Sequence, residues 1–269
     1  MNSFHKYYRW AVPVFFILLL LINYLSSAGI MLPATQAEVS DKYVNLFAPA
    51  GITFSIWAVI YIGMGLTISI DFIRPKGDKF GMYYRQLILP RMVEWVALNI
   101  VWVICWSNEW LLASLIVILL YATRIMKSVE AISATPVLRE NPWYLKYPMG
   151  LHFGWLLVAS MANLTTYTVS QGVDLTGLLG IIWTVALMII VVALSAYYYM
   201  KLGNEMIMPA ALWTLVGIFL NHSPFSSFEH KEVSIMYITV VIFVISAVGF
   251  VQLFRLQKEQ RAERENKNR

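Results

Sequence analysis

Residues 95–106 read WVALNIVWVICW, an unbroken apolar run that contains three tryptophans and one carboxamide. Four of its side chains recur at intervals of three and four residues and so share one face of a helix: Trp95, Asn99, Trp102 and Trp106. A helix face that meets lipid needs only aliphatic side chains. Tryptophans beside a carboxamide therefore predict a face that meets another helix or a ligand.

Two other apolar segments have a similar stripe. The first consists of Phe54, Trp57, Tyr61 and Gly65, and the second consists of His152, Trp155, Ala159 and Asn163. Helical periodicity places each set on one face. The three stripes together predict a binding cavity inside a membrane helix bundle.

The composition assigns the chain to the membrane. Hydrophobic residues make up 59% and charged residues 13% of the 269 residues, and the mean hydropathy is +0.65. A helix needs about 20 apolar residues to cross a bilayer. Eight segments qualify, which predicts an all-α, polytopic bundle of about eight transmembrane helices: 11–30, 48–70, 90–107, 109–126, 148–169, 175–199, 206–221 and 234–254.

The distribution of basic residues predicts the orientation, because Lys and Arg accumulate in cytoplasmic loops. If the chain starts inside, all 20 basic residues except Lys42 and Lys231 fall on the cytoplasmic side, and both termini are cytoplasmic. Orientation therefore explains the net charge of +5 better than nucleic-acid binding, which we do not expect. The bilayer is the expected partner, including anionic lipid at its inner leaflet.

The first apolar run, from Trp10 to Leu32, is longer than the core of a signal peptide, which favours an uncleaved helix. We expect a bacterial cytoplasmic membrane, with organelle membranes as the alternative. The loop from Met31 to Phe47 is long enough to form a lid. Gly150 and Gly154 allow close helix packing, within one chain by preference and in a homodimer as the alternative.

Few residues suggest reactive chemistry. Glu94 and Asp71 lie near the cytoplasmic ends of their segments, and we expect Glu94 to pair with Arg91 or to extend to the lipid headgroups. The histidines lack partners at the spacing of a metal site, so no metal is expected. Nucleophile, phosphate-binding and dinucleotide motifs do not occur, which favours a protein that is not an enzyme.

Asn99 and Asn163 need hydrogen-bond partners, because an unpaired carboxamide in hydrocarbon costs several kcal/mol. The sequence allows two kinds of partner for these carboxamides, polar groups on neighbouring helices and polar groups of a ligand. Trp57, Trp102 and Trp155 lie deeper than the interfacial belt, and their flat rings suit a planar hydrophobic ligand. His152 shares the face of Trp155 and joins the candidate ligand-binding residues.

Three motifs resemble those of the tryptophan-rich sensory protein and translocator protein family, TspO/MBR. Pro49, Gly51 and Phe54, followed by Trp57, Tyr61, Met64 and Gly65, match the first; Leu98-Asn99 with Trp102 match the second; Pro148 with Trp155, Ala159 and Asn163 match the third. The resemblance implies a five-helix core over residues 1–170. Three additional helices over 171–255 and a basic cytoplasmic tail over 256–269 exceed that plan.

The resemblance also implies a function. Members of the family bind porphyrins and, in mitochondria, cholesterol, in a pocket below the loop between the first two helices. Tetrapyrroles and sterols are therefore the expected ligands, with no required cofactor. Carried over by position, the pocket residues are Pro49, Phe54, Trp57, Tyr61, Asn99, Trp102, Trp155, Ala159 and Asn163.

This chain departs from the family in its first loop, where Val39 to Ala48 contain no Trp, and in the spacing between Phe54 and Trp57, which is one residue shorter. The leading hypothesis is a multi-pass protein that binds, transports or senses a planar hydrophobic molecule. The alternatives are a porphyrin-degrading enzyme, a proton-coupled carrier that uses Glu94, and a structural partner of a membrane complex.

Overall fold

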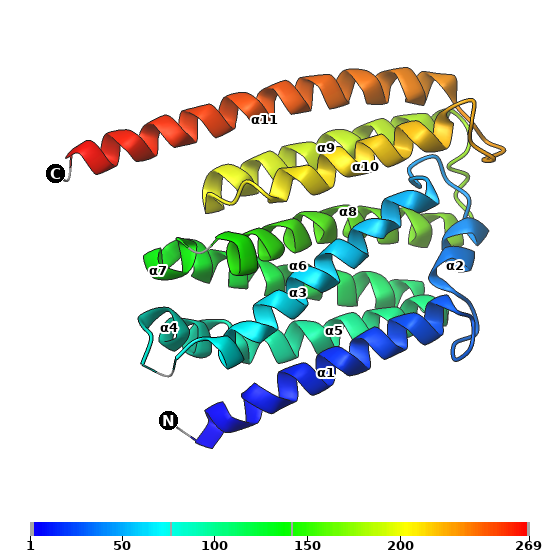
Figure 1. Cartoon of the computed structure of the whole chain (residues 1–269). Coiled ribbons are helices and arrows are strands. Elements are labelled where there is room, and N and C mark those ends of the chain that lie inside the picture. The colour runs from blue at the N-terminus through cyan, green and yellow to red at the C-terminus, as the bar shows by residue number, and fades with distance from the viewer. Residues whose placement is uncertain (1–2, 76, 141, 268–269) are drawn as a thin grey trace.

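The computed structural model describes residues 3–75, 77–140 and 142–267, and these fold entirely into helices and connecting loops (Figure 1). Each of the eight predicted segments is a long helix. They are α1 (Ser3–Ser27), α3 (Ile56–Ile73), α5 (Leu89–Ser107), α6 (Leu111–Ala134), α8 (Tyr147–Ser170), α9 (Leu178–Leu202), α10 (Ile207–His222) and α11 (Val233–Lys267). The predicted all-α membrane bundle is confirmed.

Six of these helices are long and apolar enough to cross a membrane by themselves. The other two are exceptions for different reasons. α10 has only 16 residues, about 24 Å of helix. α8 has 24 residues and carries polar side chains such as His152 and Asn163, which it can bury because protein surrounds most of its surface.

α8 lies at the centre of the bundle, in contact with α3, α6, α9 and α10. α5 packs between α1 and α6, and α11 lies on the outside against α9 and α10 (Figure 1). Large aliphatic side chains on the outer helices are exposed, among them Ile17, Ile189 and Ile245. This surface suits lipid, as expected of a multi-pass membrane protein.

Short helices in the loops are absent from the sequence prediction. They are α2 (Gln36–Lys42), the 3₁₀ turn η1 (Gly51–Ser55), α4 (Lys79–Leu87), α7 (Pro136–Arg139) and the π turn η2 (Pro142–Lys146). α2 begins with a capping box, in which Thr35 Oγ1 accepts from the Glu38 main-chain N–H and Glu38 accepts from that of Thr35.

Both termini lie at one end of the bundle, together with α4 and α7, while α2 lies at the other end (Figure 1). We call the end with α2 the lid end. The two lysines that were predicted to face outward both lie at this end: Lys42 is the last residue of α2, and Lys231 lies in the loop between α10 and α11. Assignment of the opposite end to the cytoplasm remains a prediction, and its Lys76 lies outside the described residues.

The expected pairing of Glu94 with Arg91 is wrong. The Glu94 carboxylate lies 3.4 Å from Arg124 on α6, whereas the Arg91 guanidinium donates to the main-chain oxygen of Leu87. Half of the Glu94 side chain is exposed, so a neighbouring helix can supply the partner. Asp71 is buried and accepts a 2.5 Å hydrogen bond from Arg85 Nε.

Gly150 and Gly154 pack within the chain. A Cβ atom on Gly154 would overlap the main-chain oxygen of Ile207 and lie 3.1 Å from the Ala210 Cβ, and one on Gly150 would overlap the Asn204 side chain. The glycines therefore allow the start of α10 to approach α8 closely.

Candidate functional site

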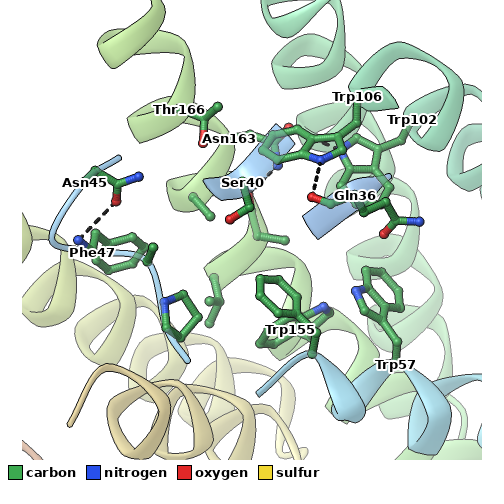
Figure 2. A pocket seen from close by; sticks show the side chains of 16 residues that line it. Gln36, Ser40, Asn45, Phe47, Trp57, Trp102, Trp106, Trp155, Asn163 and Thr166 are labelled. Atoms are coloured by element: carbon green, nitrogen blue, oxygen red, sulfur yellow. Dashed lines mark hydrogen bonds between the residues drawn. The ribbon is translucent and has the colours of Figure 1, made fainter. Parts of the chain in front are cut away.

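Four tryptophans from α3, α5 and α8 surround a small cavity at the lid end (Figure 2). Trp57 stacks on Trp102 with ring centroids 6.1 Å apart and meets Trp155 edge to face at the same distance. Trp102 in turn stacks on Trp106 at 6.0 Å. Such aromatic pairs contribute about 0.5–1.5 kcal/mol each beyond the burial of their area.

Asn163 on α8 fixes the orientation of Trp102. Its Oδ1 accepts from Trp102 Nε1 at 3.1 Å and from the Ser114 hydroxyl at 2.6 Å, and its Nδ2 donates to the Ala159 main-chain oxygen. One carboxamide therefore joins α5, α6 and α8. Both lone pairs of its oxygen are used, so Asn163 is committed to holding the cavity wall.

A second polar chain lies behind the aromatic rings. Asn99 donates to the Tyr121 hydroxyl at 3.1 Å, and the same hydroxyl lies 2.6 Å from His152 Nε2. The His152 ring meets Trp57 and Trp95 edge to face. This fully buried chain supports the rings from the side away from the cavity.

α2 covers the cavity as a lid. Gln36 and Ser40 line the space below it, and the main-chain oxygen of Gln36 accepts from Trp106 Nε1 at 3.1 Å (Figure 2). At the end of α2, Lys42 Nζ and the Tyr43 hydroxyl both donate to the Glu109 carboxylate at 2.6 Å. These hydrogen bonds lower the pKa of Glu109 and raise those of Lys42 and Tyr43.

The segment between α2 and α3 forms another wall, and α10 holds it in place. Trp213 donates to Thr53 O, Asn221 donates to Ala48 O, His222 donates to Leu46 O, and Ala50 N donates to Gly217 O, each at 2.9 Å. Gly217 is required at this contact, because a Cβ atom would overlap the Thr53 hydroxyl and lie 2.8 Å from the Pro49 Cβ.

Two neighbouring spaces result, and residues such as Phe54 and Trp57 line both of them. The inner chamber, between the four tryptophans and the lid, has about 50 Å³ of free volume. The vestibule beside it has about 970 Å³ and extends between α1, α2, η1 and the loop that joins α10 to α11. Ligand pockets in proteins typically measure about 300–1,000 Å³. The vestibule alone is therefore large enough for the body of a ligand, and the chamber admits only a projecting part.

One donor at the chamber has no partner. Trp155 is 2% exposed, lines the chamber, and its indole Nε1 makes no hydrogen bond among the described residues. A buried polar group without a partner costs about 1–3 kcal/mol. A ligand acceptor that reached this nitrogen would remove that cost.

The structure brings most of the predicted site residues together. The chamber lining includes Pro49, Phe54, Trp57, Trp102, Trp155, Ala159 and Asn163. Tyr61 lines only the vestibule, where it stacks on Trp57. Asn99 and His152 line neither space and belong to the polar chain behind the rings.

Several lining residues escaped the sequence analysis, chiefly Gln36, Ser40, Asn45, Phe47 and Thr166. Trp106 was placed on an aromatic stripe but not among the predicted pocket residues. The supporting face of α10 also escaped it, although Trp213, Gly217 and Asn221 recur at intervals of four, as the residues of the other stripes do. In the described part of the chain, no three His, Cys, Asp or Glu residues lie close enough together to hold a metal ion.

Comparison with known proteins gives a family and no individual relative. No curated protein and no solved structure matches the chain. A family model described as TSPO-like protein matches residues 9–251, from α1 into α11. The match covers most of the chain and all the helices that build the two spaces, so this protein belongs to the TSPO-like family.

Proposed function

We propose that this protein binds a planar hydrophobic molecule, a tetrapyrrole or a sterol-like compound, inside the membrane at its lid end. The ligand body occupies the vestibule, and one edge enters the inner chamber between Trp57, Trp102 and Trp155. The protein then transports or senses the bound molecule. Its two termini lie in the cytoplasm of a bacterial cell.

The observation that carries the proposal is the convergence of four indole rings from three helices on a space that shares part of its lining with the vestibule. Stacked rings supply flat apolar surface, and the unpartnered Trp155 N–H supplies one hydrogen-bond donor. Glu94 does not favour the carrier alternative, because it lies half exposed beside Arg124, near the end of α5 farthest from the chamber.

The test is a fluorescence titration of the detergent-purified full chain with protoporphyrin and with a fluorescent sterol. Trp102→Phe removes both the hydrogen bond to Asn163 and part of the stack, so we expect about tenfold weaker binding, equivalent to about 1.4 kcal/mol. Trp110→Phe is the matched control, because Trp110 is 58% exposed and lines neither space.

A second variant blocks the chamber without removing an aromatic ring. Ala159→Leu adds bulk beside Asn163, and Ala58→Leu adds the same bulk on the exposed face of α3. We expect only Ala159→Leu to weaken binding. Equal affinity in the parent, Trp102→Phe and Ala159→Leu would show that the ligand does not bind in the chamber.

A further inference from the structure

The lid end of the bundle carries an excess of negative charge. Its loops, all of them described by the structure, contain six carboxylates and two lysines: Glu38, Asp41, Glu109, Asp174, Glu229, Glu232, Lys42 and Lys231. Lys42 is bound to Glu109, and Lys231 donates to the main-chain oxygen of Ser226 at 2.6 Å. Neither lysine lines the chamber or the vestibule.

The vestibule itself is lined by two carboxylates and one histidine, His230, and by no lysine or arginine. Asp41 reaches it from α2 and Glu229 from the loop after α10; both are exposed, and neither forms an ion pair with any described residue. The vestibule lining also includes apolar and aromatic side chains, Leu20 and Tyr24 on α1 together with Phe54 and Trp57. The space is therefore amphipathic, because its lining combines apolar side chains with two exposed negative charges.

We infer that this space selects uncharged or cationic amphiphiles and disfavours anionic ones, an inference that rests on the proposed function. The apolar body of the ligand lies against Leu20, Tyr24 and Phe54, and its polar end lies near Asp41 and Glu229. Two like charges near the mouth repel an anionic end group, and salt screens that repulsion over about 10 Å at 0.1 M. Sterol-like and esterified compounds fit this field, whereas a tetrapyrrole with free carboxylates opposes it.

The experiment compares two probes that share one ring system, protoporphyrin and its dimethyl ester, in a neutral detergent with the full chain. The parent should bind the ester about tenfold more tightly than the free acid at low salt, with a smaller ratio at high salt. Esterification also changes hydrophobicity, so the decisive measurement is the change in this ratio in the variant Asp41→Asn with Glu229→Gln. That variant should gain affinity for the acid and keep its affinity for the ester.

Glu94→Gln is the matched control, because it removes one exposed carboxylate from the opposite end of α5. It should leave the ratio unchanged. If the double variant also leaves the ratio unchanged, the inference is wrong, while saturable binding of either probe still supports the proposed function. If neither probe nor a sterol binds saturably to the parent, the proposed function fails and the inference fails with it.

Discussion

The indole nitrogen of Trp106 lies 3.1 Å from the main-chain oxygen of Gln36, which ties the lid helix α2 to the cavity wall on α5. The same tryptophan stacks on Trp102, whose nitrogen is bound to Asn163. Lid and chamber are therefore held by one continuous set of contacts, and weakening the lid should alter access to the chamber.

Trp106→Phe should loosen the lid and leave the bundle folded. The variant loses one partly buried hydrogen bond, which contributes about 1 kcal/mol, and keeps an aromatic ring in the stack. Faster hydrogen exchange confined to amides of 36–42 is the expected result. Uniformly faster exchange over α5 and α8 would show that Trp106 supports the whole bundle and not the lid.

The lid should also respond to pH through Glu109. Its pKa is lowered in the folded protein. Its contribution to the stability of the lid is therefore complete above the pKa of the unfolded chain, about 4.3, and is lost as the pH falls through the pKa of the folded protein. The pKa values of Lys42 and Tyr43 are raised, so their contributions are complete below about pH 10 and are lost above it.

We therefore expect the stability of the lid contacts to be constant between about pH 5.5 and 9 and to decrease toward pH 4. Hydrogen exchange of the α2 amides, corrected for the intrinsic effect of pH, measures this response. Glu109→Gln removes the titrating group and should flatten the acid limb. The same acid limb in parent and variant would assign the response to another group.

Gly217→Ala should destabilise the protein by about 1–3 kcal/mol, because the new Cβ atom would be forced against Thr53 and Pro49. Gly249→Ala is the control, since open space surrounds that position on α11. Labelling of Cys105, the single cysteine, during heating reports unfolding of both variants. Equal stability of the two variants would mean that the segment near Pro49 can shift to make room for the new Cβ atom.

Lys146 and Glu205 form a buried ion pair with a separation of 2.5 Å. Removal of one of the two charges should strongly lower the stability of the folded protein. Burial opposes ionisation of Glu205, yet the hydrogen bond from Lys146 prevails and its pKa is lowered. Glu205→Gln removes this counter-charge from the buried Lys146 and should cost about 3–5 kcal/mol.

The exposed pair between Lys201 and Glu130, 3.8 Å apart, is the matched comparison for that variant. Glu130→Gln should cost less than about 1 kcal/mol, because solvent screens the charges. Thermal unfolding followed by circular dichroism gives both values. A loss for Glu205→Gln as small as that for Glu130→Gln would contradict a structural role for the buried pair.

The spans and the aromatic stripes were predictable because each depends on local spacing. A stretch such as 95–106 has the same period whatever surrounds it, and it confines Trp95 and Asn99 to one face. The length of the apolar segments likewise follows from the thickness of the bilayer. The α2 helix was also readable, since Thr35 and Glu38 have the spacing of a capping box.

The unpredicted parts depend on contacts between distant segments. Glu94 has Arg91 within one turn, yet the partner that reaches it comes from α6. The hydrogen bonds from α10 end on main-chain oxygens, those of Leu46 and Thr53 among them, and any residue can supply a main-chain oxygen. No pattern in residues 46–53 therefore points to a helix about 170 positions later.

Those α10 hydrogen bonds limit how the chain can be divided. The motifs that resemble the translocator family end at Asn163, within the five-helix core expected over residues 1–170, which suggests a unit that could be cut out or exchanged. A fragment that ended there would strand the main-chain oxygens of Leu46, Ala48 and Thr53 and lose the backing of Pro49. The later helices are thus inseparable from the earlier ones as a functional unit, and variation in α10 should change ligand choice without touching a single residue of the shared motifs.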